Sequence, residues 1–238
     1  MTKNSRPFKY PISNNELLYG YVFLPVYIII LPKLVGLIAS YIKPDINSNS
    51  LIIIFYLVSF LIVVTLFRKF LKSSFSDLID NKLGSFFSII SGYLCYNILM
   101  YLVSLFLLFF NVGANPNDEI IIEHIKINPN TMIAVTVLLG PVVEETLFRG
   151  VVFGTIRRKN RTAAYLVSFI VFAVYHLWEY ILVAISTTGA SGWSLILNLL
   201  QYLPGSLALA WCYERSNTLW APIFLHMLIN ALNISVIL

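Results

Sequence analysis

Seven long apolar segments dominate the sequence, and each approaches the length of about 20 residues that a helix needs to cross a bilayer. A soluble fold has no place for so much apolar surface: 58% of the residues are hydrophobic and only 11% are charged, against about 25% in a typical soluble domain. We therefore predict an all-α fold, a polytopic bundle of about seven transmembrane helices. The expected limits are 17–40, 51–67, 84–110, 131–156, 163–186, 193–211 and 219–238.

Two of the regions before residue 84 depart from a plain transmembrane pattern. The first apolar segment contains Pro25 and Pro32, so we expect it to be the least regular span, interfacial in part or broken at Pro32. It lacks a small-residue cleavage motif, which favours a retained helix over a signal peptide. Residues 68–83 mix basic and apolar side chains, which predicts a short amphipathic helix on the membrane surface, with an ordinary loop as the alternative.

The basic residues fall mainly on one side of this predicted topology. The inner segments hold Lys3, Arg6, Lys9, the cluster of Arg68, Lys69, Lys72 and Lys82, the cluster of Arg157, Arg158, Lys159 and Arg161, and Arg215. The outer loops hold only Lys43 and Lys126, with Asp118, Glu119 and Glu123 making the third loop acidic. This bias predicts a cytoplasmic N-terminus. Because no nucleic-acid-binding module accompanies the net charge of +5, we expect no nucleic-acid partner.

Ionisable side chains also lie inside the apolar segments, where each charge costs at least about 2.5 kcal/mol near the bilayer centre. They are Glu144, Glu145 and Arg149 in the fourth segment, His176 in the fifth, and His226, with the polar Asn230, in the seventh. Such groups persist where they face a protein interior or a water-filled cavity. The fourth, fifth and seventh helices are therefore expected to face one another.

Helical spacing predicts how these groups are oriented. Residues four apart are separated by about 40° around a helix, so Glu145 and Arg149 share a face and can form an ion pair. Glu144 points about 100° away. A purely structural ion pair is the alternative reading of Glu145 and Arg149.

The other two helices show the same spacing. Phe172 shares a face with His176, and His226 shares one with Asn230. The simplest packing brings Glu144, His176, His226 and Asn230 into one cavity. Taken singly, His176 and Asn230 also fit hydrogen bonds between membrane helices.

Two prolines precede these polar groups. Pro141 is expected to disrupt the helix around Val137, so that the carboxylates begin in a new helical turn. Pro222 precedes His226 by four residues in the same manner. Broken helices are tolerated at membrane depth where they border a cavity, and ordinary proline kinks are the alternative.

The residue types indicate hydrolysis. A carboxylate beside a histidine can deprotonate water, and a histidine with an asparagine can stabilise the oxyanion of a tetrahedral intermediate. No serine or cysteine is clearly paired with a base, which argues against a covalent nucleophile. Zinc held by Glu144, His176 and His226 is an alternative, although the sequence lacks the HExxH motif. Residue types alone do not separate activation by glutamate from activation by a metal.

Three motifs, in this order on successive membrane segments, carry a resemblance to a known family. They are Glu144-Glu145-x-x-x-Arg149, Phe172-x-x-x-His176 and His226-x-x-x-Asn230. The chain resembles the CAAX protease and bacteriocin-processing family of intramembrane endopeptidases, also called Abi proteins. The resemblance covers residues 131–238, which we expect to form a catalytic core, while residues 1–130 match only as generic membrane helices.

The resemblance implies roles for these residues. Glu144, with His176, would activate the water, and His226 with Asn230 would form the oxyanion hole. Glu145, Arg149 and Phe172 would support the site or contact the substrate. The family is now often described as glutamate-type, which favours a mechanism without a cofactor and leaves zinc as the alternative.

The resemblance leaves the substrate open. Eukaryotic members cleave prenylated proteins, and bacterial members are linked to bacteriocin immunity and pheromone processing. The lysine- and isoleucine-rich composition favours a bacterial cell membrane. The resemblance implies a membrane-embedded peptide or protein as the substrate. A polytopic transporter and a non-catalytic membrane scaffold or regulator are the alternative functions, since intramembrane Glu, His and Arg also build proton relays.

Overall fold

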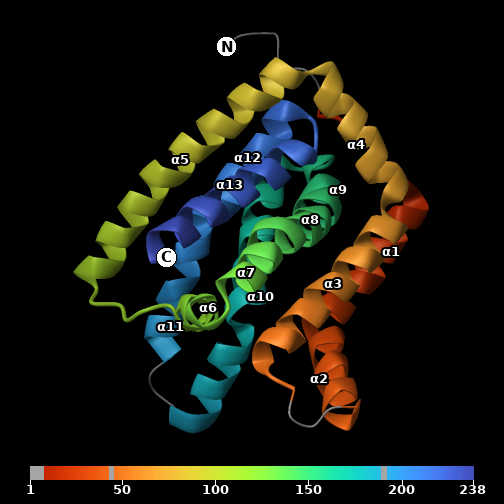
Figure 1. Ribbon diagram of the computed structural model, residues 1–238. Helices are drawn as coiled ribbons and strands as arrows, with labels where there is room; N and C mark the ends of the chain where they lie inside the picture. Colours follow the sequence, from red (N-terminus) through yellow and green to blue (C-terminus); the bar gives the residue numbers. More distant parts are fainter. Residues whose placement is uncertain (1–7, 43–45, 189–191) are drawn as a thin grey trace.

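The computed structural model describes residues 8–42, 46–188 and 192–238, and all regular structure in these ranges is helical (Figure 1). Seven helices of the described part are long and apolar enough to cross a membrane, which confirms the predicted polytopic all-α fold. They span Asn14–Ile42, Ser48–Leu66, Lys82–Phe109, Pro129–Arg157, Arg161–Val183, Ser194–Ser216 and Trp220–Ile237. Lys3, Arg6 and Lys43, on which the orientation argument draws, lie outside the described residues.

The first span is continuous, and the expected break at Pro32 is wrong. It consists of α1 (Asn14–Pro25), a π-helical turn (Val26–Ile30) and α2 (Leu31–Ile42). A π-helical turn changes the hydrogen-bond spacing locally, and this one lies directly between Pro25 and Pro32. The helix therefore accommodates both prolines without ending. A capping box between Ser13 and Glu16 fixes its start.

The amphipathic region after the second span is helical rather than a loop. Helix α4 (Arg68–Asp80) lies between α3 (Ser48–Leu66) and α5 (Lys82–Phe109). The backbone carbonyl of Leu71 accepts a hydrogen bond from the indole of Trp220, and Ser74 Oγ accepts one from the backbone N–H of Leu219. These bonds attach the buried face of α4 to the beginning of the last span.

The fourth span is the central helix of the bundle, and it continues through Pro141, while the disruption expected around Val137 takes the form of a π-helical segment. It runs through α7 (Pro129–Ile133), a π-helical segment (Ala134–Leu139), α8 (Gly140–Glu144), a second π-helical segment (Glu145–Phe153) and α9 (Gly154–Arg157). The first π-helical segment ends just before Pro141 and adapts the hydrogen bonding to it. Every residue from Gly140 to Gly154 is buried, so neighbouring helices enclose this span.

The C-terminal spans surround the central helix. They are α10 (Arg161–Thr188), α11 (Gly192–Asn198) followed by a 3₁₀ turn and α12 (Tyr202–Ser216), and α13 (Trp220–Ile237). Pro222 lies in the first turn of α13, where its missing N–H would have no helical partner, so the expected break before His226 is also wrong. Asn217 ends α12 in the left-handed conformation, with φ of 58°.

A further helix forms where the sequence predicted only an acidic outer loop. Helix α6 (Pro116–Ile127) begins with Asn115 as its N-cap and Pro116 at its first position. It packs against α7, α10 and α13, and Figure 1 shows it at the side of the bundle remote from the beginning of α5. The third loop is therefore a structural wall of the bundle.

Candidate active site

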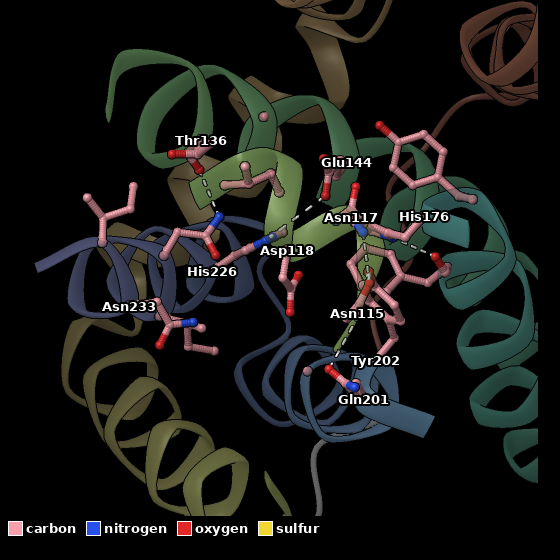
Figure 2. A pocket seen from close by; sticks show the side chains of 18 of the residues that line it. Asn115, Asn117, Asp118, Thr136, Glu144, His176, Gln201, Tyr202, His226 and Asn233 are labelled. Carbon is pink, nitrogen blue, oxygen red and sulfur yellow. Dashed lines mark hydrogen bonds and ion pairs between the residues drawn. The ribbon is translucent and has the colours of Figure 1, made fainter. Parts of the chain in front are cut away.

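One cavity of about 740 Å³ lies among the helices, and all four residues expected to be catalytic line it. Glu144 reaches it from α8, His176 from α10, and His226 and Asn230 from α13. Figure 2 shows Glu144, His176 and His226 around the same space. The fold therefore brings together four side chains that lie on three different helices.

Glu145 and Arg149 form the buried ion pair that their spacing predicts. Arg149 Nη1 donates to Glu145 Oε1 at 2.9 Å, and both side chains are fully buried. The guanidinium also lies over the ring of Phe172, with Cζ 4.2 Å from the ring centroid, which adds a cation–π contact. This ion pair connects the central helix to α10 through Phe172.

The same carboxylate fixes the orientation of His226. Nδ1 of His226 lies 2.9 Å from Glu145 Oε1, while Nε2 on the other side of the ring lies 4.0 Å from Glu144 Oε2. The imidazole is thus held between the two adjacent carboxylates. Glu145 serves as the orienting partner of the ring, which leaves Nε2 directed toward Glu144 and the cavity.

His176 is held by contacts with its own helix and with α12. Its Nδ1 lies 2.8 Å from the carbonyl oxygen of Phe172. A carbonyl oxygen only accepts hydrogen bonds, so Nδ1 carries a proton and Nε2 of the neutral ring is an acceptor. The ring stacks on Tyr202 at a centroid distance of 4.5 Å and meets the edge of Phe172 at 4.6 Å. These contacts fix both the tautomer and the plane of His176.

Asn230 makes a contact between helices at the edge of the cavity. Its Nδ2 donates to the carbonyl oxygen of Thr136 at 2.8 Å. That carbonyl belongs to the π-helical segment of the fourth span. An amide nitrogen carries two N–H donors, so one remains for a further partner. Asn230 thus connects helices and still offers a donor to the cavity.

The cavity also contains residues that the sequence did not reveal. Tyr56 on α3 donates to Glu144 Oε1 at a long distance of 3.5 Å, and Gly140 leaves room for its ring, since a Cβ at that position would lie 3.3 Å from Tyr56 Cε1. Asp118 on α6 and Tyr202 on α12 also line the cavity. A tyrosine in an apolar segment carries no distinctive sequence signal, and Asp118 resembled an ordinary loop charge. Only the packing of α3, α6 and α12 around the cavity reveals Tyr56, Asp118 and Tyr202.

The fit of the zinc alternative can be tested on the donor atoms. Within the described ranges, no group of three or more His, Cys, Asp or Glu side chains is arranged to hold a metal ion. Glu144, His176 and His226 share the cavity, but they do not converge as a ligand set.

Comparison with known proteins identifies relatives of the C-terminal half. Residues 126–232 match the family model described as "Type II CAAX prenyl endopeptidase Rce1-like". The chain is similar to a Bacillus subtilis (strain 168) protein named "Putative membrane peptidase YdiL", with 29% identity over 123 residues. That alignment covers 51% of this chain and 43% of the relative, so it spans less than half of the relative's length. No solved structure gives a significant match.

The matched region contains every site residue expected from the sequence, whereas Tyr56 and Asp118 of the cavity lie outside it. It begins in α6 and ends in α13, and it includes all three motifs together with the buried ion pair. Through residues 126–232, somewhat less than half of its length, the chain is similar to the Rce1-like type II CAAX prenyl endopeptidases.

Proposed function

We propose that the protein is an intramembrane endopeptidase that hydrolyses a peptide bond of a membrane-associated peptide or protein. The observation that carries the proposal is the position of Glu144, which is buried and faces a cavity shared with two histidines. Burying a carboxylate is costly, and ionisable residues inside membrane spans therefore mark functional sites. The similarity to the Rce1-like CAAX prenyl endopeptidases supports the same activity.

Glu144 acts as the general base in this proposal. A water molecule in the cavity donates one hydrogen bond to the Glu144 carboxylate and the other to Nε2 of His176, which is an acceptor because Nδ1 donates to Phe172. Glu144 takes a proton from this water as the water oxygen attacks the carbonyl carbon of the substrate. A new C–O bond forms, and the carbonyl π electrons move to the substrate oxygen.

His226 and Asn230 stabilise the resulting oxyanion. His226 lies between Glu144 and Glu145, and in this proposal its ring donates a hydrogen bond from each nitrogen. Nδ1–H then donates to Glu145, and Nε2–H is available to the oxyanion. The second N–H of Asn230 is the other donor. Pre-oriented donors in a water-poor site stabilise such charge strongly.

Collapse of the intermediate completes the reaction. Glu144 passes its proton to the amide nitrogen of the substrate, the oxyanion re-forms the carbonyl, and the C–N bond breaks. The products are a carboxyl group and an amine, and Glu144 is again available as the base. In this proposal each step uses only protein side chains and water, as in a glutamate-type peptidase.

A cleavage assay tests the function and the type of mechanism together. Purified protein in liposomes is incubated with hydrophobic peptides and with one prenylated peptide, with and without a strong chelator. We expect cleavage by the wild type to survive the chelator and to fall by at least about 100-fold in Glu144→Gln, as general-base catalysis supplies about 10²–10⁴-fold.

The matched control is Glu119→Gln, which removes an exposed carboxylate outside the cavity lining and should leave the rate unchanged. Loss of cleavage in the chelator with recovery on adding zinc would contradict the glutamate-type mechanism. Full activity of Glu144→Gln would contradict the assignment of the base. A transporter or scaffold would cleave none of the peptides.

A further inference from the structure

Helix α6 forms a fixed wall of the cavity. Its N-cap Asn115 is buried, and the Nδ2 of this residue donates to Tyr202 at 3.1 Å and to Gln201 at 3.4 Å. Asn198 in turn donates to the carbonyl of Ala114 at 3.3 Å. These bonds attach the beginning of α6 to the helices around α12, so the residues of its first turn have defined positions.

Asp118 in that first turn projects into the cavity. Figure 2 shows its carboxyl group in the space bordered by Glu144, His226 and Tyr202, and Asp118 is one of the lining residues. The described lining residues include no lysine or arginine, whereas Glu144 and Glu179 also contribute carboxyl groups. A positively charged group that enters the cavity would therefore meet no lysine or arginine among the described lining residues.

The surroundings of Asp118 favour the binding of such a positively charged group. Asp118 is exposed to the cavity, yet desolvation by the surrounding protein raises the pKa of its carboxyl group above the ordinary value of 3.8, and a hydrogen bond with Asn117 opposes this only in part. The raised pKa indicates that the ionised carboxylate has lost hydration without gaining a compensating charge. A substrate cation supplies that charge.

The chain also contains a residue that separates this role from a purely structural one. A carboxylate in the first turn of a helix stabilises the helix through its dipole, and both Asp118 and Glu119 occupy the first turn of α6. Only Asp118 lines the cavity. A role limited to stabilising α6 would make the two residues equivalent, whereas contact with the substrate would not.

We propose that Asp118 is a specificity-determining residue that makes the cavity select substrates with a lysine or arginine side chain near the scissile bond. This inference rests on the proposed peptidase activity and names its substrate class. The cation pairs with Asp118 while Glu144 remains free to act on water. By the same charge argument, a substrate with an acidic side chain at that position is rejected.

A panel of matched peptides tests the proposal. Each peptide is an apolar membrane segment with Lys, Gln or Glu at one position near the scissile bond, and kcat/KM is measured in liposomes for the wild type, Asp118→Asn, Asp118→Glu and Glu119→Gln. We expect the wild type to prefer Lys over Gln by about fivefold, in the range of a single exposed ion pair. Asp118→Asn should bring this ratio close to one, while Asp118→Glu and Glu119→Gln retain it.

The outcomes distinguish this inference from the proposed function. Cleavage of all three peptides at equal rates by the wild type would overturn the selectivity and leave the peptidase activity standing. An equal loss for all three peptides in Asp118→Asn, or an equal change of the ratio in Glu119→Gln, would give Asp118 a structural role and also overturn the proposal. Absence of cleavage of every peptide by the wild type would overturn the peptidase activity and this selectivity with it.

Discussion

Nδ1 of His226 lies 2.9 Å from Oε1 of Glu145, the same oxygen that accepts a hydrogen bond from Arg149 at 2.9 Å. One carboxylate therefore compensates a buried cation and fixes the ring of a residue on another helix. The adjacent Glu144 has a different environment, with Tyr56 and the cavity beside it. Two neighbouring glutamates in the sequence thus have separate tasks, and substitution should separate them.

Glu145→Gln should destabilise the protein, whereas Glu144→Gln should not. Removing the charge of Glu145 leaves the fully buried Arg149 without its partner, and breaking a buried pair in this way costs about 3–5 kcal/mol. Thermal unfolding in detergent should show a large decrease of Tm for Glu145→Gln and a small change for Glu144→Gln, although both lose peptidase activity. Equal Tm values for the two variants would contradict this division of roles.

Gly140→Ala should impair catalysis through Tyr56. The added Cβ would lie 3.2 Å from the carbonyl oxygen of Val135 and 3.3 Å from Tyr56 Cε1, so the tyrosine ring must shift by a few tenths of an ångström, whereas the distance of 3.7 Å to Glu144 Oε1 is ordinary packing. Misplacement of catalytic groups by about 1 Å can cost about 100-fold, and we expect kcat to fall by about tenfold. The control is Gly36→Ala, where a Cβ meets nothing within 4 Å; an equal loss in this variant would argue against the explanation.

The contact between the N-terminal segment and the central helix should contribute to stability. Tyr10 and Thr155 share a hydrogen bond of 2.7 Å, and a Cβ on Gly154 would lie only 2.2 Å from Tyr10 Cε2. We expect Tyr10→Phe to lower the free energy of unfolding by about 1 kcal/mol and Gly154→Ala to lower it further. Tyr41→Phe, which alters a side chain that is 91% exposed, serves as the control in denaturation experiments and should show no change.

The stability of the protein should depend on pH through Asp118. Desolvation raises the pKa of Asp118 above 3.8, so the folded protein retains this proton to a higher pH than the unfolded chain. Stability then decreases as the pH rises from 3.8 through the raised pKa. Asp118→Asn lacks this titration and should become more stable relative to the wild type across that interval.

Unfolding curves of both proteins at several pH values measure this difference. Titratable groups near Asp118 include Tyr96 on α5, Tyr180 on α10 and Tyr202 on α12, and the same cavity is lined by Glu144, His176, Glu179 and His226. They are present in both proteins, so the comparison isolates Asp118. A stability difference that does not vary with pH would show that Asp118 has the same pKa in the folded and unfolded chains.

The sequence by itself determined the class of fold and the face of each polar helix. Hydropathy requires membrane spans because the bilayer is the only solvent for these segments, and all seven are present. Spacing of four residues predicted the pairing of Glu145 with Arg149, because helical geometry depends only on local chain structure. The three motifs likewise carried the resemblance to CAAX proteases, because they are read from the sequence without any contact between helices.

The tertiary structure decided what surrounds those faces. The prolines predicted helix breaks at Pro32, around Val137 and before His226. The helices nevertheless continue, because π-helical turns lie beside Pro32 and Pro141 and because Pro222 occupies the first turn of α13. The orientation of His226 by Glu145 joins residues 81 positions apart, and Tyr56 and Asp118 enter the cavity from the half of the chain that carries no motif. Such contacts depend on how whole helices pack, which no local periodicity encodes.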